Sequence, residues 1–268
     1  MKKSLISSTS NPLVKRARGL RQKKNRRESG LFLVEGIHHV GQAVEAEWEF
    51  ESVLYAPDTL TSRFAHDLIS RLDLRPQPVT PQVMKSLSDK ENPQGILAVV
   101  KQRQTDLATF SGHGNALALV SPQDPGNVGT ILRTMDAVGL NTLFLLDGGV
   151  ELFHPSVVRA SMGALFWKTI VQTTFGEFHG WARNNDHHLI GTSAHGDLEY
   201  HKHIPESPWV LVLGNEQKGL SAEQLDACDV SVSLPMRGRV SSLNLSVAAG
   251  VLLYQYSEKN RSSALPNP

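Results

Sequence analysis

Short apolar runs alternate with stretches of helical spacing along most of the chain, and this alternation limits the possible folds more than any other feature. The runs ALALV, TLFLL and WVLVL lack the regular polar positions of a strand with one face in water. Strands that are apolar throughout and separated by helices are typical of a parallel sheet covered on both faces. The sequence therefore predicts an α/β fold, and a length of 268 residues favours two domains.

Composition shifts along the chain predict the domain boundaries. The apolar runs from LFLVEG to GILAVV follow one another as β-α-β-α-β-α-β, which indicates a small α/β domain. A polar, glycine-containing segment without periodicity then suggests a linker. The expected order is a basic arm at 1–30, the small domain at 31–101, the linker at 102–114, a larger α/β domain at 115–258 and a polar tail at 259–268.

Composition also excludes several classes of protein. The start, MKKSLISSTSNP, lacks the apolar core of ~7 to 15 residues of a secretory signal, and no run reaches the ~18 apolar residues of a spanning helix. A cytoplasmic location without membrane contact is therefore expected. A single cysteine, Cys228, excludes an internal disulfide and a multi-cysteine zinc site, and we expect it to be a small core residue. The histidine pairs lack ligand partners at a recognisable spacing, so no metal is expected.

The charge of the chain is unevenly distributed. The first 27 residues hold ten Lys or Arg residues and no acid, although the whole chain has a net charge of +1. Such a block suits a phosphate backbone, because each neutralised phosphate releases counterions, but a solvated terminus has the same composition. The candidate RNA-binding cations are Lys15, Arg16, Arg18, Arg21, Lys23, Lys24, Arg26 and Arg27.

Three predicted strands run directly into polar loops. SPQDPGN follows the strand that ends at Val120, GNEQKGLS follows Leu213, and PMRGRVSSLN follows Leu234. Ligands of parallel sheets bind beyond the carboxyl ends of the strands, so three such loops favour a single pocket. Dinucleotide, P-loop, zinc-protease and serine-hydrolase motifs are all absent from the sequence.

Each polar residue in these loops also has a purely structural interpretation. Asn127 is well suited to cap a helix that starts near it, and Ser241 or Ser242 could cap the last helix. Arg133 falls off the buried stripe of its helix, where it could be solvated or could hold a phosphate. Capping and a role in a site can coexist.

The three loops carry motifs in a fixed order. Asn127-x-Gly-x-x-x-Arg133 is followed by Gly214-Asn-Glu-x-x-Gly-Leu-Ser, and then by Pro-Met-x-Gly with Ser242-Leu-Asn-x-Ser-Val-Ala. Together they resemble the motifs of the SpoU (TrmH) family of RNA ribose methyltransferases over about residues 115 to 257. FLVEG, which contains Glu35, resembles more loosely the ribosomal-protein-like RNA-binding domain of many members, so Glu35 joins the candidate RNA-binding residues.

The resemblance implies transfer of a methyl group from S-adenosylmethionine to a ribose 2′-hydroxyl of RNA. It also implies a trefoil-knotted α/β fold and a homodimer with the active site at the subunit interface. In the family the cofactor lies in loops of the knot, and Gly214 would let it lie against the backbone. The corresponding cofactor-binding residues are Gly214, Leu234, Leu243, Met236, Asn215, Thr192 and Ser193.

The resemblance also assigns catalytic roles. Arg133 matches the family's catalytic arginine, and since a guanidinium stays protonated in proteins, electrostatic stabilisation of the developing alkoxide is favoured over proton abstraction. Glu216 would orient Arg133 or take the proton. Asn127, Ser242 and Asn244 would position the arginine, the ribose or the loops.

The front domain resembles that of rRNA-directed members of the family, and this resemblance favours 23S-type large-subunit rRNA as the substrate. The alternatives are a tRNA 2′-O-methyltransferase, a non-catalytic RNA-binding factor on the same fold, and a small-molecule enzyme. The intact Asn, Arg, Glu, Ser and Asn set argues against a non-catalytic factor, and the basic arm argues against a small-molecule enzyme. The motifs do not specify the modified nucleotide, the proton acceptor, or a housekeeping as opposed to a resistance role.

Overall fold

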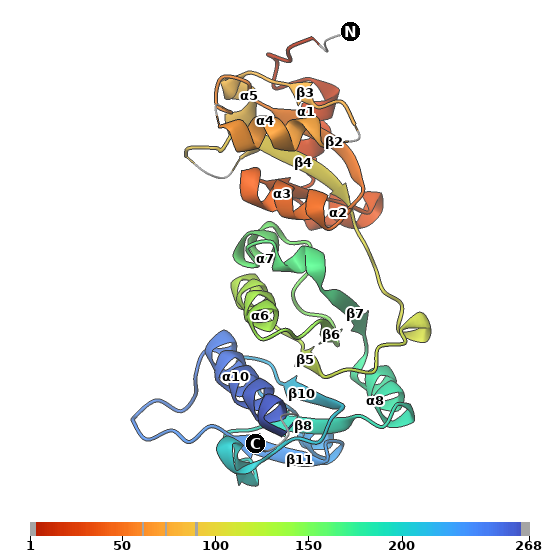
Figure 1. Ribbon diagram of the computed structural model, residues 1–268, viewed down its shortest axis with the longest axis vertical. Coiled ribbons are helices and arrows are strands. Elements are labelled where there is room, and N and C mark those ends of the chain that lie inside the picture. The colour runs from red at the N-terminus through yellow and green to blue at the C-terminus, as the bar shows by residue number, and fades with distance from the viewer. Residues whose placement is uncertain (1–3, 61, 73, 89–90, 264–268) are drawn as a thin grey trace. The chain divides into compact units, whose positions relative to one another are not determined.

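The computed structural model describes residues 4–263 except residues 61, 73, 89 and 90 (Figure 1). The chain forms two compact units, one from Met1–Arg103 with Leu152–Trp167 and the other from Gln104–Glu151 with Lys168–Pro268. The segment 152–167, which the sequence places in the second domain, thus belongs to the first unit. Residues 264–268 of the expected polar tail lie outside the described residues.

The first unit is built on a four-stranded mixed sheet in the order β1-β4-β2-β3. The strand β4 is antiparallel to both β1 and β2, and β2 is parallel to β3. The helices α3, α4 and α5 alternate with the strands, as the apolar pattern predicts. The bounds are β1 Leu31–Glu35, α3 Ile37–Glu45, β2 Phe50–Tyr55, α4 Arg63–Ser70, β3 Gln77–Pro78, α5 Pro81–Leu87 and β4 Ile96–Lys101.

The basic N-terminal segment is part of this unit's fold. It forms α1 (Pro12–Gly19), which Asn11 caps by accepting a bond from the N–H of Leu13, and α2 (Lys23–Ser29). Val14, Ala17 and Leu20 are buried in the core beside the sheet. An apolar side chain at every third position buries one face of the segment, which a charge count does not reveal. The basic arm is therefore two packed helices.

Tryptophan and phenylalanine side chains attach the segment 152–167 to the rest of the first unit. This segment holds α7 (Pro155–Ala160) and the short 3-10 helix η2 (Ala164–Trp167). The Trp48 indole donates to the carbonyl oxygen of Phe166 over 3.0 Å, and the Trp167 indole donates to the side chain of Gln42 over 2.9 Å. Phe153 and Phe166 pack against Phe32 of β1. These contacts explain why the segment belongs to the first unit and not to the domain at 115–258 that the sequence predicts.

The second unit contains a seven-stranded parallel sheet in the order β7-β6-β5-β10-β8-β11-β9. The central strands β5 and β10 are buried at every position, so the continuous apolar runs were correctly interpreted. The weaker strands β7 and β9 were not anticipated. The bounds are β5 Ala116–Val120, β6 Thr142–Leu146, β7 Thr169–Thr173, β8 His188–Thr192, β9 Leu198–Glu199, β10 Trp209–Leu213 and β11 Val230–Ser233.

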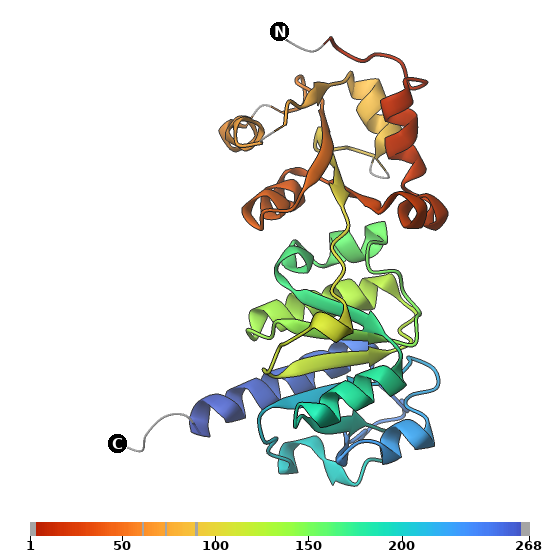
Figure 2. The same ribbon diagram turned by 90° about the vertical axis from the view of Figure 1, so that its right-hand side faces the viewer.

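Helices cover both faces of this sheet, with α6 packed on α10 on one face and α8 on the other (Figures 1 and 2). Phe144 of β6 and Phe178 of α8 lie in the core on the α8 face. The bounds are α6 Pro125–Ala137, α8 Phe175–Asn184, α9 Ala222–Asp226 and α10 Leu245–Ser263, with short 3-10 helices η1 Leu107–Thr109 and η3 Tyr200–Lys202. The helix α10 thus extends into the expected polar tail.

The helix caps differ from those that the sequence suggests. Asp124 caps α6 by accepting bonds from the N–H groups of Gly126 and Asn127, so Asn127 lies in the first turn and is not the cap. Pro125 explains the shift, because proline at the first helical position places the capping residue directly before it. At α10, the side chain of Asn244 accepts from the N–H of Ser246 over 2.9 Å, and neither serine of the preceding loop is needed as a cap. Asn244 thus takes the capping role expected of a serine, and Asn127 needs another interpretation.

The described ranges bear on two of the exclusions made from composition. None of the helices described there has the length and apolarity needed to span a bilayer. Those ranges also hold no group of three or more His, Cys, Asp or Glu side chains arranged to bind a metal ion. Cys228 packs at the edge of the second unit's core, where burial raises the pKa of its thiol to about 12. It is therefore an inert thiol.

Candidate active site

A cavity of about 440 Å³ lies in the second unit at the carboxyl ends of β8, β10 and β11. The loops after these three strands form its walls, together with the first turns of α10. The seven residues assigned to the cofactor from the resemblance all line this cavity, namely Thr192, Ser193, Gly214, Asn215, Leu234, Met236 and Leu243.

The loop after β10 is held in a tight backbone pairing. The Asn215 N–H donates to the carbonyl oxygen of Gly219 over 3.2 Å, and the Gly219 N–H donates back to Asn215 over 2.9 Å. A Cβ atom on Gly214 would lie 2.1 Å from the Gly219 carbonyl carbon and 2.3 Å from the backbone nitrogen of Leu220. Glycine is thus required at position 214 by the approach of the chain's own backbone, in addition to any contact with a cofactor.

The Asn215 side chain stabilises the loop after β10 internally and also ties it to the loop after β5. Its amide nitrogen donates to the carbonyl oxygen of Ser121, in the loop after β5, over 2.8 Å. Its amide oxygen accepts from the N–H groups of Gln217 and Lys218 over 2.9 and 3.2 Å. Asn215 therefore stabilises the cavity wall through all of these contacts.

Glu216 bridges the same two loops with its carboxylate. The carboxylate accepts from the N–H groups of Gln123 and Asp124 over 2.9 and 3.1 Å and from the side-chain amide of Asn127 over 3.2 Å. Partial burial raises the pKa of Glu216, but these hydrogen bonds and its own N–H outweigh burial and hold the pKa below its usual value. A carboxylate stabilised in this way is a weak proton acceptor.

Asn127 links the Glu216 carboxylate to the third loop. Its side-chain oxygen accepts from the amide nitrogen of Asn244 over 3.0 Å. A continuous chain of hydrogen bonds thus runs from Asn244 through Asn127 to Glu216 and joins the loops after β11, β5 and β10. The three loops thus meet, but they do not all form the single pocket that the sequence predicts. The loop after β5 contributes no residue to the cavity lining, and neither Asn127 nor Asn244 lines it.

Arg133 is not part of this network. It is exposed on α6, it does not line the cavity, and the described residues offer it no hydrogen bond or ion pair. The expected contact between Glu216 and Arg133 is therefore not present within one chain. Ser242 does line the cavity, and its side chain is exposed.

Sequence reasoning missed two titratable residues of the cavity wall. His195 and Lys218 both line the cavity and are exposed. His195 is two residues beyond Ser193, and Lys218 precedes Gly219 in the second motif. One hint was available in the sequence, because both residues belong to loops that carry assigned cofactor residues. The motifs, however, specify neither position.

The candidate RNA-binding residues occupy different environments in the first unit. Lys15, Lys23, Lys24 and Arg27 are exposed, and Arg16 pairs with Glu51 over 2.8 Å. Arg18 donates to the carbonyl oxygen of Thr9 over 2.9 Å and is partly buried.

Arg26 differs from the other candidate RNA-binding residues because it is buried. It is 1% exposed and donates to the carbonyl oxygens of Leu20 and Arg21 over 2.7 Å each. These bonds close the turn between α1 and α2, so the guanidinium serves the fold and cannot reach a ligand in this conformation. The basic pattern alone does not distinguish this buried cation from its exposed neighbours.

Comparison with known proteins gives matches over both units. The profile of the SpoU rRNA Methylase family matches residues 114–254, and the MRM3-like substrate binding domain matches residues 11–98. The chain is 33% identical over 246 residues to the 23S rRNA (uridine(2479)-2′-O)-methyltransferase of Streptomyces viridochromogenes, which covers 88% of this chain and 85% of that protein. It is 30% identical over 250 residues to the 23S rRNA (guanosine(2553)-2′-O)-methyltransferase of Bacillus subtilis, covering 93% and 97%.

Solved structures match over nearly the whole chain. An rRNA methyltransferase from Sinorhizobium meliloti superposes with a TM-score of 0.86 at 29% identity, covering 99% of this chain and 100% of that one. The SpoU methyltransferase AviRb from Streptomyces viridochromogenes, in complex with the cofactor AdoMet, superposes with a TM-score of 0.85 at 30% identity, covering 94% and 99%. AdoMet is S-adenosylmethionine.

Proposed function

Because the chain belongs to the SpoU rRNA methylase family, we propose that it transfers the methyl group of S-adenosylmethionine to a ribose 2′-hydroxyl of large-subunit ribosomal RNA. One observation carries the proposal: all seven residues assigned to the cofactor line a single cavity at the carboxyl ends of the central strands. The relatives that match across most of the chain are named as 23S rRNA 2′-O-methyltransferases. We also propose a cytoplasmic location, since the relatives named as 23S rRNA methyltransferases are bacterial proteins.

The residues of the cavity fit S-adenosylmethionine. Leu234, Met236 and Leu243 supply an apolar wall, and the backbone around Gly214 supplies main-chain hydrogen-bonding groups, a combination that suits an adenosyl group. When bound, the cofactor supplies an electrophilic methyl group. The trefoil knot implied by the resemblance stays a prediction.

Arg133 is assigned the stabilisation of the transition state. The ribose 2′-hydroxyl loses its proton to solvent water as its oxygen takes the methyl group, and a permanently protonated guanidinium beside it lowers the energy of the developing alkoxide. Glu216 is not assigned the proton, because its oxygens already accept three hydrogen bonds from neighbouring residues and its pKa is lowered. Glu216, Asn127 and Asn244 instead hold the three loops together, and Ser242 positions the ribose.

A second copy of the chain is proposed to complete the site. Val247, Val251 and Tyr254 lie one helical turn apart on α10 and are 50%, 38% and 51% exposed. This apolar stripe suits a two-fold interface, in which the same surface of each copy meets its counterpart. Since α10 packs on α6, which carries Arg133, such an interface brings Arg133 of the partner subunit toward the cavity.

The test is methyl transfer from labelled S-adenosylmethionine to purified 23S rRNA, 16S rRNA and tRNA, with the product mapped by resistance of the modified ribose to alkaline hydrolysis. We expect label in 23S rRNA at one position and none without RNA. Label confined to tRNA would establish a tRNA 2′-O-methyltransferase, and label without RNA a small-molecule enzyme. RNA binding without affinity for the cofactor would establish a non-catalytic factor.

A further inference from the structure

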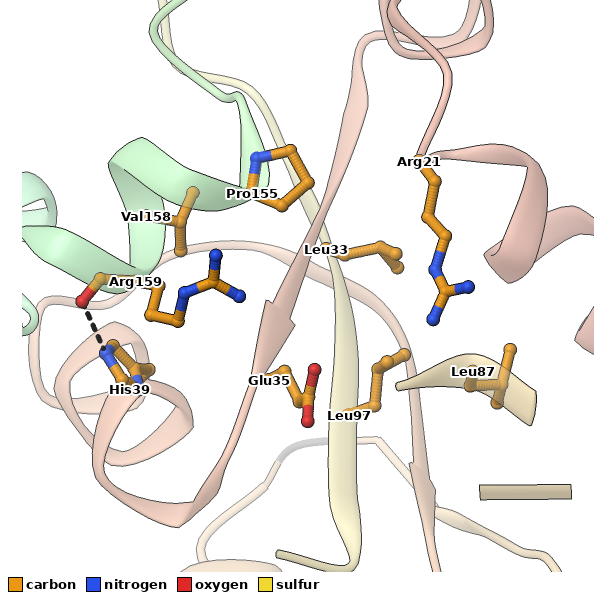
Figure 3. A pocket seen from close by; sticks show the side chains of 9 residues that line it. All are labelled: Arg21, Leu33, Glu35, His39, Leu87, Leu97, Pro155, Val158 and Arg159. Atoms are coloured by element: carbon orange, nitrogen blue, oxygen red, sulfur yellow. Dashed lines mark hydrogen bonds between the residues drawn. The ribbon is translucent and has the colours of Figure 1, made fainter. Parts of the chain in front are cut away.

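The first unit contains a second, smaller cavity that methyl transfer does not use. It measures about 30 Å³ and lies between β1, β4, α5 and α7 (Figure 3). Three charged side chains line it, Arg21 from the turn between α1 and α2, Glu35 from the end of β1 and Arg159 from α7. Leu33, Leu97 and Val158 are among the apolar side chains that complete the wall.

The two arginines reach the cavity from different sides. Figure 3 shows the Arg159 guanidinium on the α7 side, the Arg21 guanidinium on the opposite side, and the Glu35 carboxylate between them. Figure 3 also shows the contact that fixes α7 here, in which the ring nitrogen Nε2 of His39 lies 3.3 Å from the carbonyl oxygen of Arg159. A nearby contact joins His38 Nε2 to the carbonyl oxygen of Met162 over 3.0 Å. The cations are thus presented by fixed backbone.

The Glu35 carboxylate is oriented by the fold. One oxygen, Oε1, accepts from the hydroxyl of Ser88 over 2.5 Å, and the backbone of Glu35 pairs with Leu97 in the sheet. Glu35 is only partly buried, so its carboxylate can accept a further donor. The cavity therefore presents two cationic donors and one anionic acceptor to a ligand.

This combination selects a particular ligand chemistry. A bare phosphate would be attracted by the guanidiniums but repelled by Glu35, whereas a ligand with both an anionic group and a hydroxyl donor satisfies all three side chains. A cavity of about 30 Å³ holds about two water-sized groups, which is too little space for a nucleobase. The ligand must therefore insert a small polar part.

We propose that this cavity binds the polar edge of a ribose-phosphate unit of the RNA substrate, with one phosphate oxygen between Arg21 and Arg159, the 2′-hydroxyl of the adjoining ribose donating to Glu35, and the rest of the unit outside the cavity. DNA lacks that hydroxyl, so Glu35 is the residue that makes this contact specific for RNA. The exposed cations Lys23, Lys24 and Arg27 follow Arg21 directly in α2 and continue the positive surface along the nucleic acid. This inference rests on the proposed RNA substrate and identifies a contact away from the methyl-transfer site.

The test compares binding of full-length protein to the unstructured oligonucleotides rU12 and dU12, because single strands of equal sequence remove the effect of duplex shape. We expect the wild type to prefer rU12, and Glu35→Ala to remove the preference by lowering affinity for rU12 about tenfold more than for dU12. Glu35→Gln keeps an acceptor oxygen and loses the negative charge, so it should bind both oligonucleotides more tightly and still prefer rU12.

The arginines give a different signature. Arg159→Ala should weaken both oligonucleotides equally and reduce the slope of log affinity against log salt by about 0.7, as expected for one lost phosphate contact on a single strand. Arg63→Ala is the matched control, since the Arg63 side chain is 97% exposed in the same unit and does not line the cavity. Its salt slope should equal that of the wild type.

Two outcomes would overturn the inference. One is a preference for rU12 that survives Glu35→Ala, and the other is an unchanged salt slope in Arg159→Ala. If Glu35→Ala fails to fold, the Glu35→Gln and Arg159→Ala comparisons still decide. Methyl transfer separates this inference from the proposed function, because Arg159→Ala should raise the KM for RNA with little change in kcat. A protein without methyl-transfer activity could still show the oligonucleotide preference.

Discussion

Asn127 donates its side-chain amide to the carboxylate of Glu216 over 3.2 Å, although the two residues are 89 positions apart in the sequence. The bond joins the first turn of α6 to the loop after β10. Because Glu216 also accepts from two backbone N–H groups of the loop after β5, one carboxylate fixes that loop to the loop after β10. The Glu216 carboxylate, which lines the cavity, thus acts as a structural bridge.

We expect Glu216→Gln to destabilise the protein by about 1–3 kcal/mol, because the amide cannot accept all three bonds from its neighbours. The folded state lowers the pKa of Glu216 from its usual 4.5, so the carboxylate contributes stability above the unfolded-state pKa and loses it as the pH falls through the folded-state pKa. The difference in unfolding free energy between wild type and variant should be constant near about pH 7 and shrink below about pH 4.5. Urea titrations at several pH values measure it.

The same variant tests the chemistry. If Glu216 only bridges the loops, as proposed, Glu216→Gln should keep the shape of the pH profile of kcat, even if the rate falls through misplacement of the loops. Disappearance of an acidic limb from that profile would instead assign the proton to Glu216.

We expect Gly214→Ala to weaken the binding of S-adenosylmethionine tenfold or more, about 1.4 kcal/mol. The added Cβ would lie 2.1 Å from the Gly219 backbone, so the loop that forms the cavity wall must move. Gly238→Ala is the matched control in the neighbouring loop, because its Cβ would have no heavy atom within 4 Å. Calorimetric titration of both variants should show near-wild-type affinity for Gly238→Ala. Equal affinity in both would show that the pairing of Asn215 with Gly219 does not shape the cavity.

The strands and the convergence of loops could be predicted from the sequence because both are set by local pattern. Continuous apolar runs such as Trp209–Leu213 can only be buried on both faces, and parallel strands place the following loops at one edge of the sheet. The strand Thr169–Thr173 was missed because its run is short and ends in polar residues. Its pairing with β6 decides its conformation.

The roles of individual polar residues could not be predicted in the same way, because they depend on tertiary partners. Asn127 is a sound N-cap by residue type, and only the neighbouring Asp124-Pro125 pair and the distant Glu216 carboxylate give it a different role. Arg26 resembles its basic neighbours in sequence, but the turn between α1 and α2 buries it. The spacing of apolar residues shows which face of a helix or strand is buried. It does not show which distant residue a polar side chain will contact.

We expect the triple variant Lys23→Ala, Lys24→Ala, Arg27→Ala to reduce the salt slope of RNA binding by about 2, which is three single-strand phosphate contacts. All three side chains are exposed, so the melting temperature should change little. Removing the segment altogether is a poor test, since it also removes the buried Val14 and Leu20. Filter binding from low to high salt measures the slope, and a slope equal to that of the wild type would exclude these cations from the RNA contact.

We expect Arg133→Ala to abolish methyl transfer while the affinity for S-adenosylmethionine stays near that of the wild type, because Arg133 does not line the cavity of its own chain. Mixed dimers test where it acts. Arg133→Ala protomers and Gly214→Arg protomers are each inactive alone, and co-expression with different tags yields the heterodimer. If the partner subunit's Arg133 completes each site, the heterodimer has one site with both parts intact, and a random mixture should recover about a quarter of wild-type turnover. If Arg133 acts on the cavity of its own chain, every site in the mixture lacks one part, and no activity returns.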